Sequence, residues 1–123
     1  MARVRILIVD DEPGVCQIVA TVLNRAGYEA VTAPGPQKAL DIVSGGCPFD
    51  LVVSDVVMPE MCGPELARQI RRMCPSSAIM LMSGCVPVGR LPRGVPFLGK
   101  PFSASDLLGA VDKVLRESSA RNL

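Results

Sequence analysis

The sequence predicts an α/β fold: a single doubly wound, five-stranded parallel sheet with the flavodoxin-like strand order 2-1-3-4-5. Short apolar runs rich in β-branched residues alternate with amphipathic segments along nearly the whole chain of 123 residues. The apolar runs are continuous, which is typical of strands covered by helices on both faces. The length fits one domain of about 100–200 residues, and parallel strands of one sheet are connected by right-handed crossovers.

The first half of the chain supplies two strands and two helices. Residues 4–9 form a buried strand, and Pro13 suits the first turn of the helix that follows. Apolar residues then recur at the helical period until Gly27, which ends the helix. A short strand is predicted at residues 29–33 and a second helix at residues 36–43.

The second half continues the alternation. Residues 50–54 form a strand, and a helix follows Gly63-Pro64. Strands at residues 78–82 and 95–98 come next. Ser103 is suited to cap the last helix. We expect a folded domain over residues 1–117 and a frayed polar tail over residues 118–123.

The composition excludes several classes of protein. Apolar residues make up 49% of the chain, yet no stretch approaches the ~18 residues that a membrane-spanning helix needs. No small-residue cleavage site follows the first apolar run, so we expect a cytoplasmic protein that stays out of the membrane. The net charge is +1 without a run of Lys and Arg, so no direct nucleic-acid contact is predicted.

The cysteines and the absence of histidine narrow the chemistry further. Five cysteines, at positions 16, 47, 62, 74 and 85, form an odd set without a C-x-x-C pair. With no secretory signal, both a disulfide and a zinc site are disfavoured. The chain has no histidine, which excludes a Ser-His or Cys-His nucleophile and a His-ligated metal within it.

Polar residues stand where the predicted strands end. Asp10 and Asp11 follow the first strand, Asp55 the third, Ser83 the fourth and Lys100 the fifth. The carboxyl ends of parallel strands meet at one edge of the sheet, where ligands bind in folds of this type. We therefore expect these side chains to converge on one shallow pocket.

Such a pocket suits phosphoryl chemistry with a metal. At 4 Å and an effective dielectric of about 20, each pair of carboxylates repels by about 4 kcal/mol, which a divalent cation relieves. Oxygen ligands with open water positions favour Mg²⁺. An ionised carboxylate beside Mg²⁺ can attack phosphorus, while Lys100 and Ser83 neutralise the phosphoryl oxygens.

Each residue taken alone also has an ordinary structural explanation. Asp10 and Asp11 could stabilise the start of the first helix through its dipole. Asp55 and Ser83 could be turn residues, and Lys100 a solvated charge before a loop. Their coincidence at the ends of parallel strands favours the functional interpretation.

Four motifs carry a resemblance to a known family. They are IVDDE at residues 8–12, SDVVMP at 54–59, MSG at 82–84 and LGKPF at 98–102. This set resembles that of response-regulator receiver domains, and the match runs from about Val4 to Leu115. The resemblance implies that Asp55 is the phosphorylated residue. It also implies a Mg²⁺ site in which Asp11 is a direct ligand, Asp10 acts through a metal-bound water, and Asp55 and the Val57 backbone carbonyl complete the protein's share.

The resemblance further implies a switch and its partners. Lys100 would pair with the phosphoryl group, Ser83 would move to hydrogen-bond it, and the rotamer of Phe97 would follow Ser83. Family members take the group from a histidine kinase or histidine phosphotransfer protein and act on a downstream protein target. Such a domain is not an enzyme for external substrates, because it promotes only its own phosphorylation and dephosphorylation.

The sequence departs from the receiver pattern between Ser83 and Phe97. Three prolines and three glycines fall there, where receivers carry a longer loop and a fourth helix. Because a helix does not persist through this composition, we predict that the fourth helix is missing or shortened, which alters the usual output surface. Val57 and Cys85 occupy positions that flank the hydrolytic water in the family, and neither orients water well, which predicts a slow loss of the phosphoryl group.

Two other functions remain as alternatives. A metal-dependent phosphohydrolase with an aspartate nucleophile would normally carry D-x-D after the first strand, whereas Asp10 and Asp11 are adjacent. A receiver-like module that binds partners without phosphorylation is less favoured, because all key positions are present. Nucleotide binding is disfavoured since neither G-x-G-x-x-G nor a P-loop occurs. The sequence leaves open whether a homodimer forms and whether the chain is a stand-alone regulator.

Overall fold

The computed structural model describes the chain over residues 3–84 and 94–121. Its five strands form one parallel sheet in the order β2-β1-β3-β4-β5, which confirms the predicted fold class. The strands are β1 (Arg5–Val9), β2 (Glu29–Ala33), β3 (Leu51–Asp55), β4 (Ala78–Ser83) and β5 (Phe97–Gly99). The prediction of a missing or shortened fourth helix falls on residues 85–93, which lie outside the described residues.

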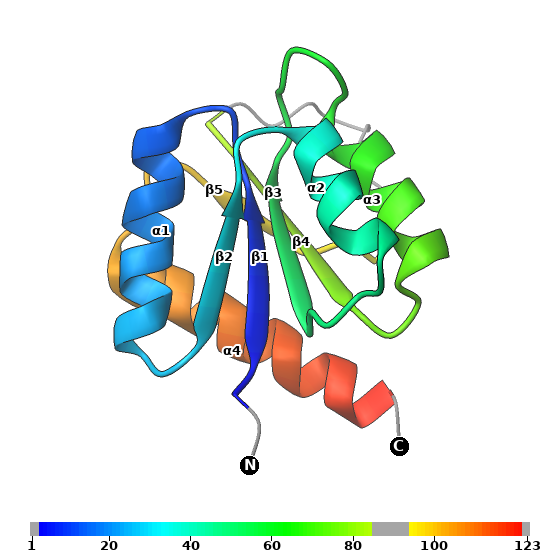
Figure 1. Cartoon of the computed structure of the whole chain (residues 1–123). Coiled ribbons are helices and arrows are strands. Elements are labelled where there is room, and N and C mark those ends of the chain that lie inside the picture. Colours follow the sequence, from blue (N-terminus) through cyan, green and yellow to red (C-terminus); the bar gives the residue numbers. More distant parts are fainter. Residues whose placement is uncertain (1–2, 85–93, 122–123) are drawn as a thin grey trace.

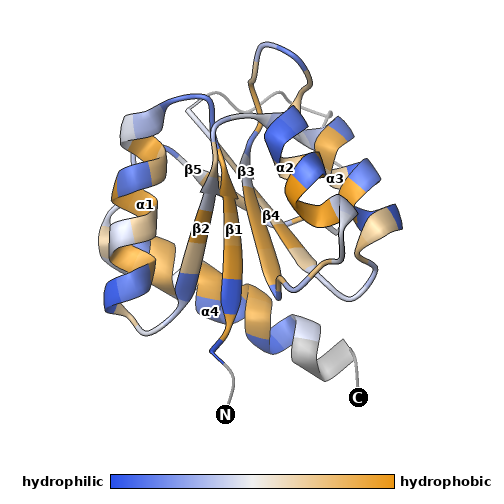
Figure 2. Cartoon of the chain, viewed as in Figure 1, coloured by the Kyte–Doolittle hydropathy of each residue, from blue (hydrophilic) through white to orange (hydrophobic). Residues whose placement is uncertain are grey.

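Helices cover both faces of the sheet (Figure 1). They are α1 (Pro13–Arg25), α2 (Pro36–Ser44), α3 (Gly63–Met73) and α4 (Ala104–Arg121). One group of buried side chains joins α2 and α3 to the sheet, and a second joins α1 and α4 to its other face. Figure 2 shows the strands as mostly hydrophobic, as expected for a sheet that is buried between two helical layers.

Local sequence explains where the helices start. Proline stands in the first turn of α1, α2 and α3, where its missing N–H leaves no hydrogen bond unmade. The helix α4 is capped as predicted: the Ser103 hydroxyl accepts a hydrogen bond from the Asp106 N–H at 3.0 Å. In return, the Asp106 carboxylate accepts one from the Ser103 N–H at 3.2 Å.

The last helix is longer than the sequence predicts. A frayed tail is expected from Ser118, but α4 continues as helix to Arg121. The polar composition after residue 117 therefore does not mark where the helix terminates. No helix within the described ranges is both long and apolar enough to cross a membrane.

The expectation that the cysteines would not form a disulfide is wrong for one pair. Cys47 and Cys74 are bonded, with their Cα atoms 5.7 Å apart and a sequence separation of 27. Their spacing in the sequence matches no motif. The two cysteines meet because the fold places the ends of α2 and α3 together. Of the other described cysteines, Cys16 is a buried free thiol and Cys62 an exposed one.

Candidate functional site

Three carboxylates meet at the carboxyl edge of the sheet. Asp10 directly follows β1 and Asp55 ends β3, and these two strands are paired neighbours. Asp10 is fully buried and Asp55 is 6% exposed, whereas Asp11 is exposed to solvent. Ligand oxygens of Asp10, Asp11 and Asp55 all lie within 4.8 Å of one another. The predicted acidic cluster is therefore present.

Lys100 lies against this cluster. Its Nζ is 3.1 Å from Oδ2 of Asp10 and 3.5 Å from Oδ1 of Asp55. The loop that carries it is held by the Lys100 N–H, which donates to the Ser83 carbonyl at 2.9 Å. Burial lowers the pKa of Lys100, but the hydrogen bond to Asp10 and the charges of Asp10 and Asp55 outweigh it, so the pKa is raised overall. Lys100 is therefore held as a cation.

Backbone amides orient the two buried carboxylates. Oδ1 of Asp10 accepts a hydrogen bond from the Glu12 N–H at 2.9 Å, and Oδ1 of Asp55 accepts one from the Val56 N–H at 3.0 Å. Burial and then the charge of Asp10 raise the pKa of Asp55, and Lys100 offsets part of this rise. The carboxylates thus repel each other within a site that already contains one cation.

The structure places the remaining predicted site residues, Ser83, Phe97 and Val57, on β4, on β5 and just after β3. Ser83 is the buried last residue of β4 and lies opposite Gly99 in the sheet register, next to the strand end that carries Lys100. Phe97 begins β5 and packs, half-buried, against the core beneath α2 and α3. Val57 lies two residues beyond Asp55 and is 64% exposed.

Sequence reasoning missed one residue of the site. Gly63, the buried first residue of α3, packs on the main chain of the β3–α3 loop: a Cβ there would lie 2.3 Å from the Asp55 carbonyl oxygen and 2.9 Å from the Val56 Cα. The Gly63 N–H also donates to the Val56 carbonyl at 2.8 Å. In the sequence, Gly63-Pro64 indicates only the loop before a helix. The signal that could have indicated a role for Gly63 is its position eight residues after a candidate nucleophile.

Replacing Gly63 by alanine is expected to lower the free energy of unfolding by about 1–3 kcal/mol, because the added methyl overpacks against backbone that cannot rotate away. Urea unfolding would measure it. Gly109→Ala is the matched control, since a Cβ there meets nothing within 4 Å and a helical alanine should stabilise by about 0.5–1 kcal/mol. A Gly63→Ala protein as stable as the parent would contradict the close approach.

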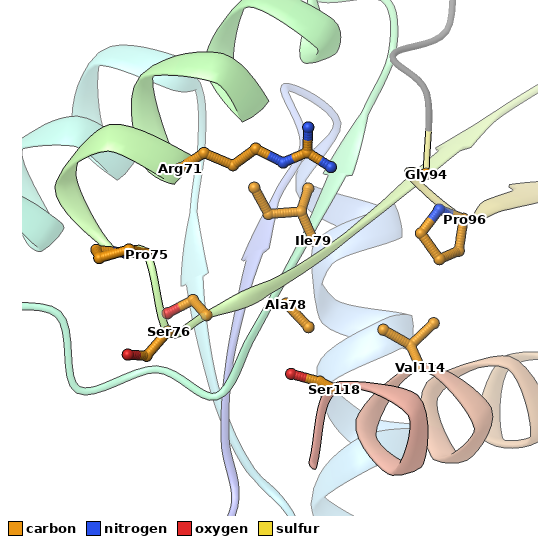
Figure 3. Close-up of a pocket in the computed structure, with 10 residues that line it drawn as sticks. Arg71, Pro75, Ser76, Ala78, Ile79, Gly94, Pro96, Val114 and Ser118 are labelled. Atoms are coloured by element: carbon orange, nitrogen blue, oxygen red, sulfur yellow. The ribbon is translucent and has the colours of Figure 1, made fainter. Parts of the chain in front are cut away.

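Two concave regions differ in their relation to the acidic cluster. A groove of about 450 Å³ between α1 and the β5–α4 loop is lined by Lys100 and by Val15, Ile18 and Phe102. A cavity of about 350 Å³ at the amino end of β4 is lined by Arg71, Ser76, Ile79, Pro96 and Ser118 (Figure 3). The described lining of this second cavity has no carboxylate, so it is not the acceptor site.

Comparison with known proteins gives the family. The model of the response regulator receiver domain matches residues 6–112. The chain is 33% identical to the response regulator receiver protein CpdR of Brucella abortus, over 90% of this chain and 96% of that protein. It is 36% identical to the sensor kinase CckA of the same organism, over 91% of this chain but only 12% of the kinase.

A solved structure of a response regulator protein is also similar to this chain. The response regulator protein TrrA of Thermotoga maritima, in complex with Mg²⁺–BeF, superposes with a TM-score of 0.81. It is 31% identical, and the match covers 90% of this chain and 98% of that one. The matched family, the sheet order and the acidic edge all agree. The chain therefore belongs to the response regulator receiver domain family.

Proposed function

We propose that this chain accepts a phosphoryl group on Asp55, with Mg²⁺ bound beside it, and thereby switches a surface that binds a downstream protein. The observation that carries the proposal is the convergence of three carboxylates within 4.8 Å of one another, opposed by Lys100. Its partner in this reaction would be a histidine kinase or a histidine phosphotransfer protein. This would place the chain in the cytoplasm, where such donors act.

The donor set fits Mg²⁺. Asp10, Asp11 and Asp55 offer oxygen ligands alone, and the exposure of Asp11 leaves room for the water molecules that Mg²⁺ retains. The backbone carbonyl of Val57 is the fourth protein ligand we propose. When bound, Mg²⁺ would offset the repulsion of the carboxylates and the negative charge on the phosphoryl oxygens. The relative TrrA was solved with Mg²⁺–BeF, which supports this assignment.

The two oxygens of Asp55 have different surroundings. Oδ1 accepts from the Val56 N–H and faces Lys100. Within the described part of the chain no hydrogen bond reaches Oδ2, so we assign Oδ2 as the attacking atom. A new bond from Oδ2 to phosphorus would form as the bond between phosphorus and the donor's imidazole nitrogen breaks. Lys100 would then stabilise the phosphoryl oxygens, and the Ser83 hydroxyl would donate to one of them.

The groove beside Lys100 supports a protein as the donor. The chain has no histidine, so a phosphohistidine donor must lie outside these 123 residues. Ile18 is 65% exposed on the wall of this groove, next to the approach to Asp55. A donor that reaches Asp55 along it would cover this apolar surface. The chain would act on itself alone and would not turn over an external substrate.

Mass spectrometry after exposure to a small phosphodonor tests the proposal. We expect a single added phosphoryl group, mapped to Asp55, that forms with Mg²⁺ and is absent in excess chelator. Asp55→Asn should remain unmodified, while Asp41→Asn, a change at an exposed position of α2, should be phosphorylated as the parent is. Modification that persists in Asp55→Asn or in chelator would refute the assignment.

A further inference from the structure

The disulfide encloses the segment that carries the proposed phosphoacceptor. Cys47 lies in the connection from α2 to β3, and Cys74 directly follows α3. The ring closed by their bond therefore contains β3, Asp55, the β3–α3 loop and α3. Figure 1 shows that α2 and α3 lie side by side on one face of the sheet, which brings their carboxyl ends together.

The two sulfur atoms differ in access to solvent. Cys47 is half-buried and lines a surface groove of about 630 Å³ together with Gly45, Gly46 and Pro48. Cys74 is only 3% exposed and packs in the core beneath α2 and α3. A small thiol or disulfide can thus reach Cys47, whereas Cys74 can react only with its neighbour in the fold.

The surroundings also suit the reduced state. The Ser77 hydroxyl donates its hydrogen to the Phe49 carbonyl at 2.5 Å, and its oxygen lies 3.3 Å from Sγ of Cys47. Because that hydrogen is already committed, the Ser77 oxygen is free to accept from a Cys47 thiol. In the disulfide, Sγ of Cys47 is bonded to Cys74, and in the dithiol it has the Ser77 oxygen as an acceptor.

The bond fixes the second end of α3. At the end near the acidic cluster, Gly63 is already held by its 2.8 Å hydrogen bond to Val56 and by its close packing on Asp55. At the other end, Cys74 is covalently tied to the segment that leads into β3. Oxidation therefore restricts α3 relative to the strand that carries Asp55, and reduction releases this covalent attachment while the core packing of α3 remains.

We propose that Cys47 and Cys74 form a reversible thiol–disulfide modification site that reacts with low-molecular-weight disulfides and thiols of the glutathione class. In oxidation, the Cys47 thiolate attacks the small disulfide and one small thiolate leaves. The Cys74 thiolate then attacks Sγ of Cys47 in this mixed disulfide. The second small thiolate, which the first step had attached to Cys47, leaves. The two protein thiols lose two electrons and two protons, and the small disulfide gains the electrons. Reduction follows the same steps in reverse and does not depend on whether Asp55 is phosphorylated.

The test uses the full chain with Cys62→Ser, which removes the exposed free thiol found among the described residues. The protein is equilibrated with oxidised or reduced glutathione, alkylated and mapped by mass spectrometry. We expect a Cys47–Cys74 cross-linked peptide in the oxidised sample and separately alkylated Cys47 and Cys74 in the reduced one. The oxidised form should unfold at a temperature roughly 10 °C higher, as expected for a ring of this size. Amides of α3 should exchange about 10–100-fold more slowly in the oxidised form.

Single variants separate the roles of the two sulfurs. In Cys74→Ser, glutathione should accumulate as a mixed disulfide on Cys47, while in Cys47→Ser the buried Cys74 should stay unmodified. The double variant should unfold like the reduced parent, and its unfolding temperature should be the same in oxidised and reduced glutathione. Equal adducts on both cysteines, no cross-linked peptide, or the same unfolding temperature in both redox states would each overturn the proposal.

Discussion

Replacing Lys100 by methionine is expected to slow the phosphorylation of Asp55 by about a hundredfold or more, the usual cost of removing one preorganised donor from an anionic transition state. Methionine keeps most of the length of the side chain and removes its charge. The ammonium lies 3.1 Å from Asp10 and 3.5 Å from Asp55, close enough to reach an oxygen of a phosphoryl group on Asp55. The measurement is the rate of phosphorylation by a small phosphodonor at saturating Mg²⁺.

The same variant should bind Mg²⁺ more tightly. Lys100 and a metal both neutralise Asp10 and Asp55, so removal of the ammonium leaves the carboxylates to the metal alone. Lys113→Met, at an exposed position of α4, is the matched control and should change neither property. If Lys100→Met lost Mg²⁺ binding together with the transfer rate, the lysine would be needed to shape the site and not to stabilise the phosphoryl group.

Much of this fold could be predicted because its signals are local. Continuous apolar runs such as the one ending at Val9 occur in few settings other than a sheet covered on both faces. Proline in the first helical turn and the cap at Ser103 then mark where helices begin. The site follows from the same logic, because a residue that ends a parallel strand must lie at the carboxyl edge of the sheet. This is why Asp10, Asp55 and Lys100 could be brought together from sequence.

The features that sequence reasoning missed depend on contacts between distant elements. The bond between Cys47 and Cys74 requires the ends of α2 and α3 to be neighbours, which no spacing rule contains. The role of Gly63 depends on how closely α3 approaches the Asp55 carbonyl. The full length of α4 is not evident in the sequence because polar residues such as those after position 117 occur in coil and in helix alike.

Replacing Val57 by asparagine is expected to shorten the lifetime of the phosphoryl group on Asp55 about ten- to hundredfold. Because valine does not orient the hydrolytic water, the activation free energy of hydrolysis should be about 1–3 kcal/mol higher in the parent protein. Val57 is 64% exposed, two residues beyond Asp55, so its side chain can line the approach of a hydrolytic water without forming a hydrogen bond to it. Cys85, predicted to flank the same path, lies outside the described residues. The half-life of the phosphorylated protein measures the effect.

Val57→Ala separates the two reasons for a slow reaction. It removes the bulk of valine and supplies no hydrogen bond, so it should accelerate hydrolysis less than Val57→Asn if orientation of the water dominates. Equal acceleration in both variants would show instead that crowding by Val57 limits the reaction. A parent half-life of seconds, or no acceleration in Val57→Asn, would show that Val57 does not set the lifetime and that the slow-switch hypothesis is wrong.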